Sequence, residues 1–492
     1  MLRTIDAFLN RYTMYRIVLY GLAALLVAAE ALSLAGAIAV PAGGLALAVA
    51  ILSAGCYAAN KLFAMVFRAA TNTESWLISA LILACIMPQA TSVTRAAYLL
   101  LAAVVAMASK YVLVWRGSHV FNPAAVAAFV LGVAGLLPAT WWVATPWLAP
   151  FTAVLAVVVL RKIRNFTVCV VFGAVAVALL VYIGVVLHGF ELGDTVKAAV
   201  LSWPVIFLGS IMLTEPTTLP PTRYYQILVA MLVGAVFAAQ THVWKVYSTP
   251  ETALLIGNIF TLLFVPATGA MLRLRRITQM SPDIYDAAFE QPRRRLSFTP
   301  GQYMEWTLPH RHADSRGNRR LFSIASAPGE QDIHIGFRHY APSSSFKDAL
   351  LALKPGQYIR TAHVAGNFTL PADARRPLLF VVGGIGITPV RSMMQHLLAT
   401  GERRDMALVY FANREEDFVY ADVMHEAEAI GLKAHFVVGR PDAAVLQQNV
   451  PDLAGRLAYL SGPDALVTAC KGMLRGLGTP IQNIRTDHFT GY

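Results

Sequence analysis

Short segments between residues 320 and 463 combine arginine, hydroxyl side chains and glycine in patterns that suit phosphate binding and hydride chemistry. The stretch Arg320-Leu321-Phe322-Ser323 places a guanidinium, which can pair with a phosphate, close to an aromatic ring and a hydroxyl. A flat cofactor ring could stack on Phe322, and the Ser323 hydroxyl could hydrogen-bond the ring atom that receives hydride. Alone, this stretch would equally fit an ordinary strand with a surface arginine.

A group of hydroxyls follows downstream. The run Pro342-Ser-Ser344-Ser345 opens a helical segment that is expected to end at Leu353. Hydroxyls and backbone amides at a helix N-terminus can hold a pyrophosphate. Simple capping of the helix would explain these serines too, and the two interpretations are compatible.

Residues 378–389 predict a buried strand that enters a glycine-rich turn and then a helix. The stretch reads Leu-Leu-Phe-Val-Val-Gly383-Gly-Ile-Gly386-Ile-Thr388-Pro389, and the helix is expected from Val390. This arrangement aims backbone N–H groups and a helix dipole at a dinucleotide pyrophosphate. A glycine-rich loop alone is weak evidence for a dinucleotide-binding site, and the strand before it and the helix after it make that evidence stronger. Further strands are expected at 407–412 and 435–438.

In this order the motifs resemble the ferredoxin–NADP reductase family, over residues 271–492. The resemblance implies an antiparallel β-barrel that binds FAD, at 271–373, and an α/β nucleotide-binding domain, at 374–492. It assigns FAD binding to Arg320, Leu321, Phe322, Ser323, Ser344 and Ser345. It assigns the NAD(P)H pyrophosphate region to Gly383, Gly386, Thr388 and Pro389.

The same resemblance names the residues around the reacting rings. Gly462 and Pro463 would lie beside the nicotinamide, and Ser461 stands where relatives often have cysteine. Tyr492 resembles the aromatic residue that stacks on the flavin in relatives. Ser323, Ser461 and Tyr492 are therefore the candidate catalytic residues.

The sequence leaves open whether NADH or NADPH is used. Arg414 and Arg440 each follow an expected strand, and either could meet the 2′-phosphate of NADPH. Arg414 is followed by Glu415-Glu416-Asp417, which would repel that phosphate. The acidic run favours NADH.

The first half of the chain is basic and strongly apolar. The 492 residues are 57% hydrophobic and carry a net charge of +12, and 17 Lys and Arg against 7 Asp and Glu stand at or before Arg276. These basic residues lie between apolar runs. That placement is typical of loops at a membrane surface and does not indicate a nucleic-acid-binding patch. Contact with membrane lipid, and no nucleic-acid partner, is expected.

Ten apolar runs could each cross a bilayer, which needs ~20 mostly apolar residues. They cover about residues 15–35, 40–60, 75–91, 94–115, 121–137, 145–161, 166–188, 196–213, 224–243 and 250–268. With the N-terminus inside, 14 Lys and Arg fall in inside loops and 3 in outside loops. An even number of spans then places both termini in the cytoplasm, where NAD(P)H is found. The sequence thus predicts a multi-pass protein of a bacterial-type inner membrane.

The apolar half also contains an internal repeat. Pro88 lies near the end of the third apolar run, and Pro216 closely follows the eighth. Two runs after each of these, an X-Pro pair opens the next matching run: Asn122-Pro123 opens the fifth and Thr249-Pro250 opens the tenth. Repeats of five helices must be inverted relative to each other, and paired breaks of this kind point to a binding site at the membrane midplane. Proline could also simply cap helix ends.

The motifs Ser109-Lys110, His119-Val-Phe-Asn122-Pro123 and Thr214-Glu215-Pro216-Thr217 resemble the NqrB/RnfD family, which supplies membrane subunits to sodium-translocating NADH:quinone reductase and to the Rnf complex. The resemblance covers about residues 60–268 of a transmembrane domain expected at 1–270, and it implies a flavin within the membrane. The attachment stretches of relatives, Gly-Glu-Thr-Ser and Ser-Gly-Ala-Thr, do not occur, so a second, non-covalent flavin is implied. Candidate ligands for such a cofactor are Asn122, Thr214, Glu215 and Thr217.

The whole sequence therefore predicts three parts: a polytopic helical domain of about ten spans, a flavin barrel and a nucleotide domain. No C-x-x-C motif occurs among the four cysteines, which excludes a plant-type iron–sulfur cluster, and no metal site is expected. Electrons from NAD(P)H and FAD are then expected to enter the membrane domain, bound for a flavin, a quinone or an extracytoplasmic redox protein. A transporter with a redox-sensing reductase half, or one subunit of a larger ion-pumping complex, remains an alternative.

Overall fold

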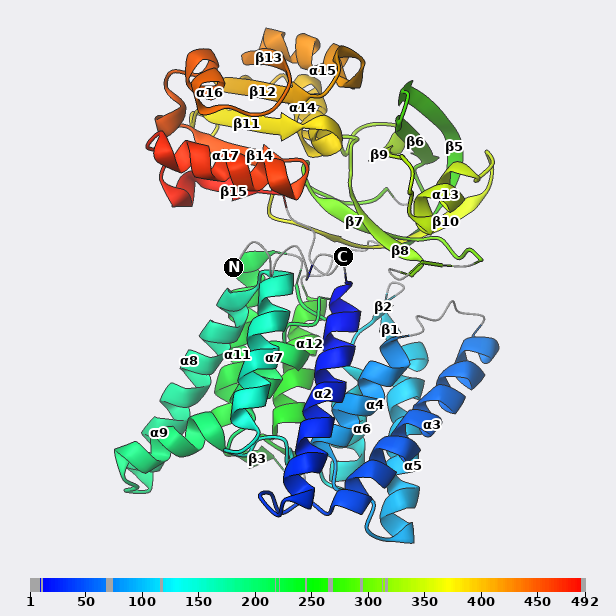
Figure 1. Cartoon of the computed structure of the whole chain (residues 1–492), viewed down its shortest axis with the longest axis vertical. Helices are drawn as coiled ribbons and strands as arrows, with labels where there is room; N and C mark the ends of the chain where they lie inside the picture. The colour runs from blue at the N-terminus through cyan, green and yellow to red at the C-terminus, as the bar shows by residue number, and fades with distance from the viewer. Residues whose placement is uncertain are drawn as a thin grey trace. The chain divides into compact units, whose positions relative to one another are not determined.

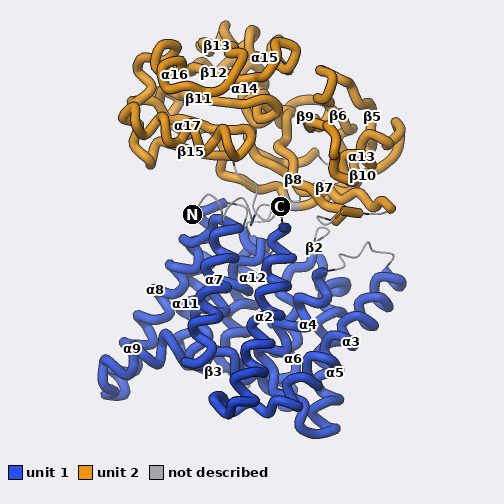
Figure 2. The backbone as a smooth tube through the Cα atoms, viewed as in Figure 1, with its two compact units in different colours: residues 1–265, 490–492 blue, residues 266–489 orange. Residues whose placement is uncertain are grey.

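The chain folds into two compact units in the computed structural model, one of residues 1–265 and 490–492 and one of residues 266–489 (Figure 2). The structure describes residues 9, 12–67, 74–115, 118–216, 218–220, 222–243, 246–263, 269–292, 295–311, 313–314 and 317–487. Each unit is taken by itself below.

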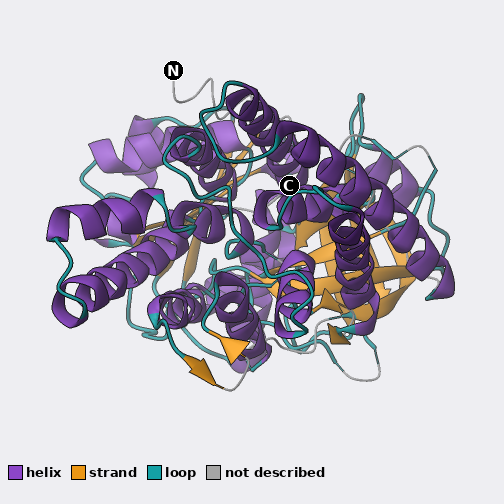
Figure 3. Cartoon of the chain, turned by 90° about the horizontal axis from the view of Figure 1, so that it is seen from below, coloured by secondary structure: helices purple, strands orange, loops and turns teal. Residues whose placement is uncertain are grey.

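Unit 1 is helical apart from two short hairpins in its described part (Figures 1 and 3). Its helical segments are α2 (Met14–Leu34), α3 (Ala42–Val66), α4 (Ser75–Ile86), α5 (Val93–Val112), α6 (Pro123–Val133), α7 (Ala149–Ile163), α8 (Phe166–Tyr182), η1 (Ile183–Leu187), α9 (Leu192–Leu201), α10 (Val205–Phe207), η2 (Leu208–Met212), α11 (Arg223–Ala238) and α12 (Pro250–Leu262). The hairpins pair β1 (Val114–Trp115) with β2 (Ser118–His119) and β3 (His242–Val243) with β4 (Val246–Tyr247).

The X-Pro dipeptides begin helices, as predicted. Asn122 caps α6, because its Oδ1 accepts hydrogen bonds from the amides of Ala124 at 3.1 Å and Ala125 at 3.2 Å. Thr249 caps α12 in the same way through the amide of Thr252. Proline suits the first helical position, because the N–H that it lacks would have no hydrogen-bond partner inside the helix.

The predicted number of ten spans is too high. Every predicted run contains a helical segment, but among the described residues only four helices are long and apolar enough to cross a bilayer: Met14–Leu34, Ala42–Val66, Val93–Val112 and Phe166–Leu187. The bent pair Leu192–Leu201 and Val205–Met212 would make a fifth. The remaining apolar segments are shorter than the ~20 residues that a span needs, because breaks such as those before Pro88 and Pro216 end the helix early.

The two halves of unit 1 have the same order of elements. In the first half, α4 ends before Pro88, α5 follows, and the β1–β2 hairpin leads into α6. In the second half, η2 ends before Pro216, α11 follows, and the β3–β4 hairpin leads into α12. The β2 and β3 strands lie at opposite ends of this unit in Figure 1.

Unit 2 begins with an antiparallel sheet whose strand order is β8-β7-β10-β5-β6-β9. The strands are β5 (Ala270–Ser281), β6 (Ile284–Glu290), β7 (Tyr303–Thr307), β8 (Arg319–Ser323), β9 (Asp332–Arg338) and β10 (Tyr358–Ala365), with helix α13 (Ser345–Leu351) between the last two. The amide of Ala325, just after β8, donates to the carbonyl of His334 in β9 at 2.8 Å, so the two edges of the sheet approach each other. Buried side chains such as Phe289 and Trp306 fill the inside of this rolled sheet.

One local prediction in this region is wrong. The pattern at 298–303 predicts a strand ahead of a turn, but the turn at Pro300-Gly301 comes first and β7 begins only at Tyr303. Gly301 has φ of +93°, and a Cβ atom there would collide with the carbonyl oxygen of Phe368, so this tight turn requires glycine.

A parallel sheet forms the rest of unit 2, with strand order β13-β12-β11-β14-β15. The elements are β11 (Leu378–Gly383), η3 (Gly384–Ile387), α14 (Thr388–Thr400), β12 (Met406–Ala412), η4 (Glu415–Asp417), α15 (Ala421–Glu426), η5 (Ala427–Ile430), β13 (Leu432–Val438), α16 (Ala443–Asn449), η6 (Leu453–Gly455), β14 (Leu457–Ser461), α17 (Asp464–Gly476), η7 (Ile481–Asn483) and β15 (Ile484–Thr486). Alternate residues of the central strand point to opposite faces: Phe380 packs with α14, and Val381 with α17. Helices on both faces explain why β11 is apolar throughout.

Candidate functional site

Two predicted catalytic serines meet at one carboxyl group in unit 2. Ser323 ends β8 of the antiparallel sheet, and Ser461 ends β14 of the parallel sheet. Their hydroxyls donate hydrogen bonds to Oδ2 of Asp487, at 3.3 Å from Ser323 and 3.2 Å from Ser461. The backbone amide of Asp487 is held in turn by the carbonyl of Leu460 at 2.9 Å. The structure therefore brings the hydroxyl expected at the flavin and the one expected at the nicotinamide to a shared partner.

Asp487 is a candidate functional residue that the sequence analysis missed. Burial raises the pKa of its carboxyl group from the usual 3.8 to about 6, against the opposing effect of the hydrogen bonds from Ser461 and Ser323. A carboxyl group with such a pKa can hold or release a proton near neutral pH. The sequence shows an acid near the C-terminus, but its burial depends on partners from β8 and β14, which no local pattern indicates.

The glycine-rich turn after β11 lies directly against the turn after β14. A Cβ atom on Gly386 would come within 2.5 Å of the amide nitrogen of Gly462, and Gly462 itself has φ of +139°. Glycine is needed at both positions, because a side chain would force apart the two turns that are expected to hold the coenzyme. Thr388 and Pro389 form the first turn of α14, and the Thr388 hydroxyl donates to the carbonyl of Ile385 at 3.1 Å.

The predicted phosphate-binding groups of the barrel also come together. One terminal nitrogen of the Arg320 guanidinium, NH2, lies 2.9 Å from each carboxylate oxygen of Asp314. The Ser345 hydroxyl accepts a hydrogen bond from the amide of Asp314 at 2.8 Å and contacts Nε2 of His310 at 2.9 Å. The Asp314 carboxylate thus occupies the anion-binding side of Arg320, and this donor set suits a phosphate group.

The other predicted flavin ligands lie around this point. Ser344 caps α13, since its hydroxyl accepts from the amide of Lys347 at 3.4 Å. Phe322 is partly buried beside Phe337 and Phe346, with ring centroids 6.4 Å and 5.9 Å away. Leu321 is its partly buried neighbour on β8. Stacking of a flavin on Phe322 stays a prediction.

Two predicted site residues, Thr217 and Tyr492, lie outside the described residues. Pro463 precedes α17 as its N-cap residue, next to Gly462.

In unit 1, three of the predicted membrane-cofactor residues line one cavity. Asn122, Thr214 and Glu215 face it, and Nδ2 of Asn122 donates to Oε2 of Glu215 at 3.1 Å. The space between these side chains is about 570 Å³, a volume that includes open solvent. The helix breaks at Pro123 and Pro216, from different halves of the unit, thus meet at a single place.

Further polar groups of this cavity were not predicted as ligands. Lys110, from the Ser109-Lys110 motif, belongs to the last turn of α5, and its Nζ donates to the carbonyl and hydroxyl oxygens of Ser75 at 2.9 Å each. Ser79 and Tyr15 line the cavity as well. The remaining wall is apolar and includes Met14, Val18, Ile78, Ile82, Val159 and Ile211. Opposite charges on Lys110 and Glu215, set among apolar side chains, could orient a flat ligand with a polar edge.

Comparison with known proteins bears on unit 2. Residues 380–472 match the profile of the oxidoreductase NAD-binding domain family. The carboxy-terminal half of the chain is an NAD(P)H-dependent, FAD-containing oxidoreductase.

Three similar proteins each align with 44–46% of this chain. The reductase component of propane 2-monooxygenase from Rhodococcus jostii is 29% identical over 249 residues, which are 46% of this chain and 65% of that protein. Ferredoxin–NADP reductase B of Sorangium cellulosum is 27% identical over 239 residues, or 44% of this chain and 96% of that protein. The crystal structure of an Amycolatopsis cytochrome P450 reductase aligns with a TM-score of 0.41 and 20% identity, covering 46% of this chain and 71% of that one.

Proposed function

We propose that the protein is a membrane-bound oxidoreductase that takes electrons from NADH or NADPH through FAD and passes them into or across the membrane. One observation carries this proposal: a single chain joins the reductase unit to a helical unit in which polar groups at helix breaks line one cavity. The cysteine positions provide no iron–sulfur cluster as an exit from the flavin. The electrons are therefore destined for a flavin, a quinone or an extracytoplasmic redox protein.

The reductase residues have distinct tasks in this scheme. When bound, FAD accepts a hydride and releases its electrons one at a time. Arg320 and Ser345 would hold its phosphate groups, and the turns at Gly386 and Gly462 would admit the coenzyme pyrophosphate. Ser323 and Ser461 would position the reacting rings, and the Asp487 carboxylate, which accepts from both hydroxyls, would stabilise the positive charge that hydride loss leaves on the nicotinamide.

The cavity of unit 1 would bind a second, non-covalent flavin or the acceptor itself. The matching order of elements in the two halves supports an inverted repeat, as in the membrane proteins that this unit resembles in sequence. Non-helical backbone at membrane depth is tolerated where it lines such a cavity. Asn122, Thr214, Glu215 and Lys110 would hold the polar edge of the ligand, and the apolar wall its ring.

A direct test is extraction of the cofactors from the full chain purified in detergent. The proposal expects FAD together with a second flavin or a bound quinone, and reduction of an artificial dye by NADH or NADPH. Chain preparations without FAD would contradict the reductase assignment. Preparations with FAD alone would contradict a second flavin in the membrane unit.

Location and orientation are part of the same proposal. The basic residues between the apolar runs of the first half, 17 Lys and Arg against 7 Asp and Glu at or before Arg276, support a bacterial-type inner membrane, and the use of NAD(P)H places the reductase unit and the C-terminus in the cytoplasm. A cytoplasmic reporter fused after Tyr492 should therefore be active. If that reporter is inactive and a periplasmic reporter at the same position is active, the proposed orientation is wrong and the proposed direction of electron flow must be reversed.

Two other functions fit part of the same observations. Matching halves with paired breaks also suit a transporter whose reductase unit senses redox state. Solute flux through vesicles without electron transfer would favour that function. If the purified chain reduces its acceptor only when further subunits are added, it is one part of a larger complex.

A further inference from the structure

Hydride passes between two rings that different sheets of unit 2 are expected to hold. The antiparallel sheet carries the residues assigned to the flavin, and the parallel sheet carries those assigned to the nicotinamide. Reacting atoms must lie about 3–3.5 Å apart, and a displacement of ~1 Å can lower the rate about a hundredfold. The contacts that fix one sheet against the other therefore affect the reaction.

One arginine, Arg391, joins the two predicted site segments directly. It lies in α14, two residues after Pro389, and its side chain reaches the segment that follows Ser323 at the end of β8. Its NH1 donates to the carbonyl oxygen of Ala325 at 2.7 Å. NH1 and NH2 also lie 3.0 Å from the two carboxylate oxygens of Glu330, one nitrogen to each oxygen. A bidentate pair of this kind fixes direction as well as distance.

Neighbouring side chains hold this contact in place. The Ser392 hydroxyl donates to the carbonyl oxygen of Ser326 at 2.7 Å. The Arg391 guanidinium lies over the Tyr420 ring, 5.2 Å from its centroid, and the Tyr420 hydroxyl donates to Oδ1 of Asp286 in β6 at 2.7 Å. Arg391 and Ser392 are both buried, so water competes little for these bonds.

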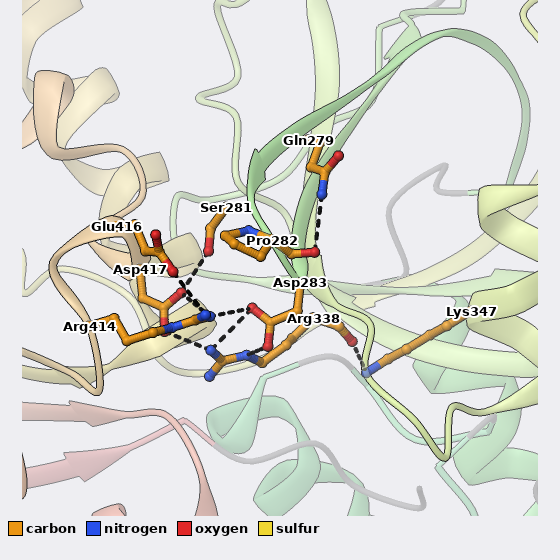
Figure 4. A network of polar contacts seen from close by, with 9 residues as sticks. All are labelled: Gln279, Ser281, Pro282, Asp283, Arg338, Lys347, Arg414, Glu416 and Asp417. Carbon is orange, nitrogen blue, oxygen red and sulfur yellow. Dashed lines mark hydrogen bonds and ion pairs between the residues drawn. The ribbon is translucent and has the colours of Figure 1, made fainter.

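A second set of bonds between the two sheets meets at Asp417 (Figure 4). The buried Asp417 carboxylate accepts hydrogen bonds from Arg338 at 2.8 Å and from the Ser281 hydroxyl at 2.6 Å, both on strands of the antiparallel sheet. Arg414, which also pairs with Asp417, lies 3.3 Å from Asp283 in the β5–β6 turn. These bonds are separate from those of α14, so loss of the α14 contact should tilt the sheets and not separate them.

We infer that Arg391 is a positioning residue for hydride transfer. It ties the segment after Ser323 to the first turns of α14, and in this way it fixes how the nicotinamide lies on the flavin. The hydrogen-bond partners of its guanidinium are Ala325 and Glu330, so it acts through the segments that it joins. The inference rests on the reductase function proposed for unit 2.

Arg456 provides a matched control within the part of unit 2 that the parallel sheet forms. Its NH1 donates to the carbonyl oxygen of Leu378 at 3.1 Å, NH1 and NH2 lie 2.9 Å and 3.3 Å from the two oxygens of Asp405, and Nε pairs with Asp452 at 2.8 Å. The side chains of Arg456 and Arg391 are 6% and 10% exposed. Arg456→Met therefore removes a similar set of bonds without loosening one sheet from the other.

The test uses the full chain with bound FAD in detergent. Anaerobic stopped-flow with saturating coenzyme gives the rate of flavin bleaching, and the long-wavelength charge-transfer absorbance reports how closely the nicotinamide stacks on the flavin. Arg391→Met should lower the bleaching rate at least about tenfold and weaken that absorbance. FAD retention and the dissociation constant of the oxidised coenzyme should stay within about threefold of the parent.

Two further measurements separate positioning from general destabilisation. Arg391→Lys keeps the charge and should restore part of the rate and of the absorbance. Hydrogen exchange at the backbone amides of residues 325–330 should be faster in Arg391→Met and unchanged in Arg456→Met. The control variant should also keep the parental rate and absorbance.

The outcomes distinguish this inference from the reductase function itself. Flavin that neither NADH nor NADPH bleaches in the unmodified protein would defeat the reductase function. Parental rate and absorbance in Arg391→Met would overturn only the positioning role. That role would also be overturned by weaker coenzyme binding with a parental rate at saturation, or by an equal loss of rate in Arg456→Met.

Ser392→Ala decides the question if Arg391→Met does not retain FAD. This variant removes only the hydrogen bond from α14 to the Ser326 carbonyl oxygen. It should lower the bleaching rate about threefold, in keeping with the loss of one neutral hydrogen bond, and weaken the charge-transfer absorbance. A parental rate and absorbance in Ser392→Ala would then contradict the inference.

Discussion

The hydroxyl of Ser461 donates a hydrogen bond to Oδ2 of Asp487 at 3.2 Å, on the same carboxylate oxygen that Ser323 contacts at 3.3 Å. Ser461 belongs to the parallel sheet and Ser323 to the antiparallel sheet. A buried carboxyl group therefore joins the two halves of the reductase unit where hydride transfer is expected. Its protonation state should influence the reaction.

Hydride transfer to the flavin should depend on pH through Asp487. Burial raises the pKa of this carboxyl group to about 6, so it is mostly protonated below that pH and mostly anionic above it. Loss of hydride leaves positive charge on the nicotinamide ring, which an adjacent carboxylate stabilises. The bleaching rate should therefore rise as pH increases through about 6, as measured by stopped-flow with saturating coenzyme.

Replacement of the carboxyl group provides the control for that pH profile. Asp487→Asn keeps an oxygen that can accept from both serines but cannot ionise. Its bleaching rate should be about tenfold lower above pH 7 and flat between pH 5 and 8. A profile in Asp487→Asn that still rises near pH 6 would assign the ionisation to another group.

Loss of the Arg320 guanidinium should weaken FAD binding. Charge-assisted hydrogen bonds contribute about 1.5–3 kcal/mol, so Arg320→Ala should raise the FAD dissociation constant about tenfold to a hundredfold. Arg319→Ala is a suitable control, because Arg319 pairs with Glu305 at 3.3 Å rather than with Asp314. Release of FAD can be followed by the recovery of flavin fluorescence on dilution. Equal retention in the two variants would remove Arg320 from the phosphate site.

A methyl group on Gly386 should impair coenzyme binding while FAD is retained. The added Cβ would meet the backbone of Gly462 at 2.5 Å, a contact that requires the two turns to separate. Gly386→Ala should therefore raise the dissociation constant of the coenzyme at least about tenfold. Gly472→Ala, where an added Cβ meets nothing within 4 Å, should leave it unchanged. Loss of FAD from Gly386→Ala would point instead to general disruption of the unit.

Local sequence patterns predicted strands and helices correctly at positions where a glycine or a proline determines the backbone conformation. The apolar run that ends at Gly383 forms β11, and the expected helix begins at Thr388, two residues earlier than predicted. Both X-Pro pairs, at Pro123 and Pro250, open helices because proline suits a first helical turn. Such signals act over a few residues and do not need a partner elsewhere in the chain.

The wrong or missing predictions depend on distant residues. Hydropathy suggested ten spans. Proline, however, ends several helices before they are long enough to cross a bilayer. Hydropathy averaged over a window does not show where a helix ends, so this shortening was missed. The Ser109-Lys110 motif gives no sign that the Lys110 ammonium bonds to Ser75 beside a polar cavity, because Ser75 lies on another helix. The altered pKa of Asp487 likewise arises from partners on β8 and β14, and neither partner can be inferred from the sequence around residue 487.

The central claim is that electrons pass from the reductase unit through the cavity of unit 1. Asn122→Ala combined with Glu215→Gln removes the amide and the charge that meet there at 3.1 Å. The matched control is Thr249→Ala with Glu251→Gln, which removes a helix cap and a carboxylate that pairs with Trp141 at 2.8 Å, both outside the residues lining the cavity. Loss of a helix cap costs about 1 kcal/mol in either variant, so folding is affected similarly.

The decisive measurement is the reduction of an acceptor sealed inside vesicles by NADH added outside, for chains whose reductase unit faces outward. Dye reduction in the external solution should be the same for the parent, the cavity variant and the control, because the reductase unit is intact in all three. Reduction of the enclosed acceptor should persist in the control and fall at least about tenfold in the cavity variant. Reduction of the enclosed acceptor at the parental rate by the cavity variant would show that Asn122 and Glu215 are not on the electron path.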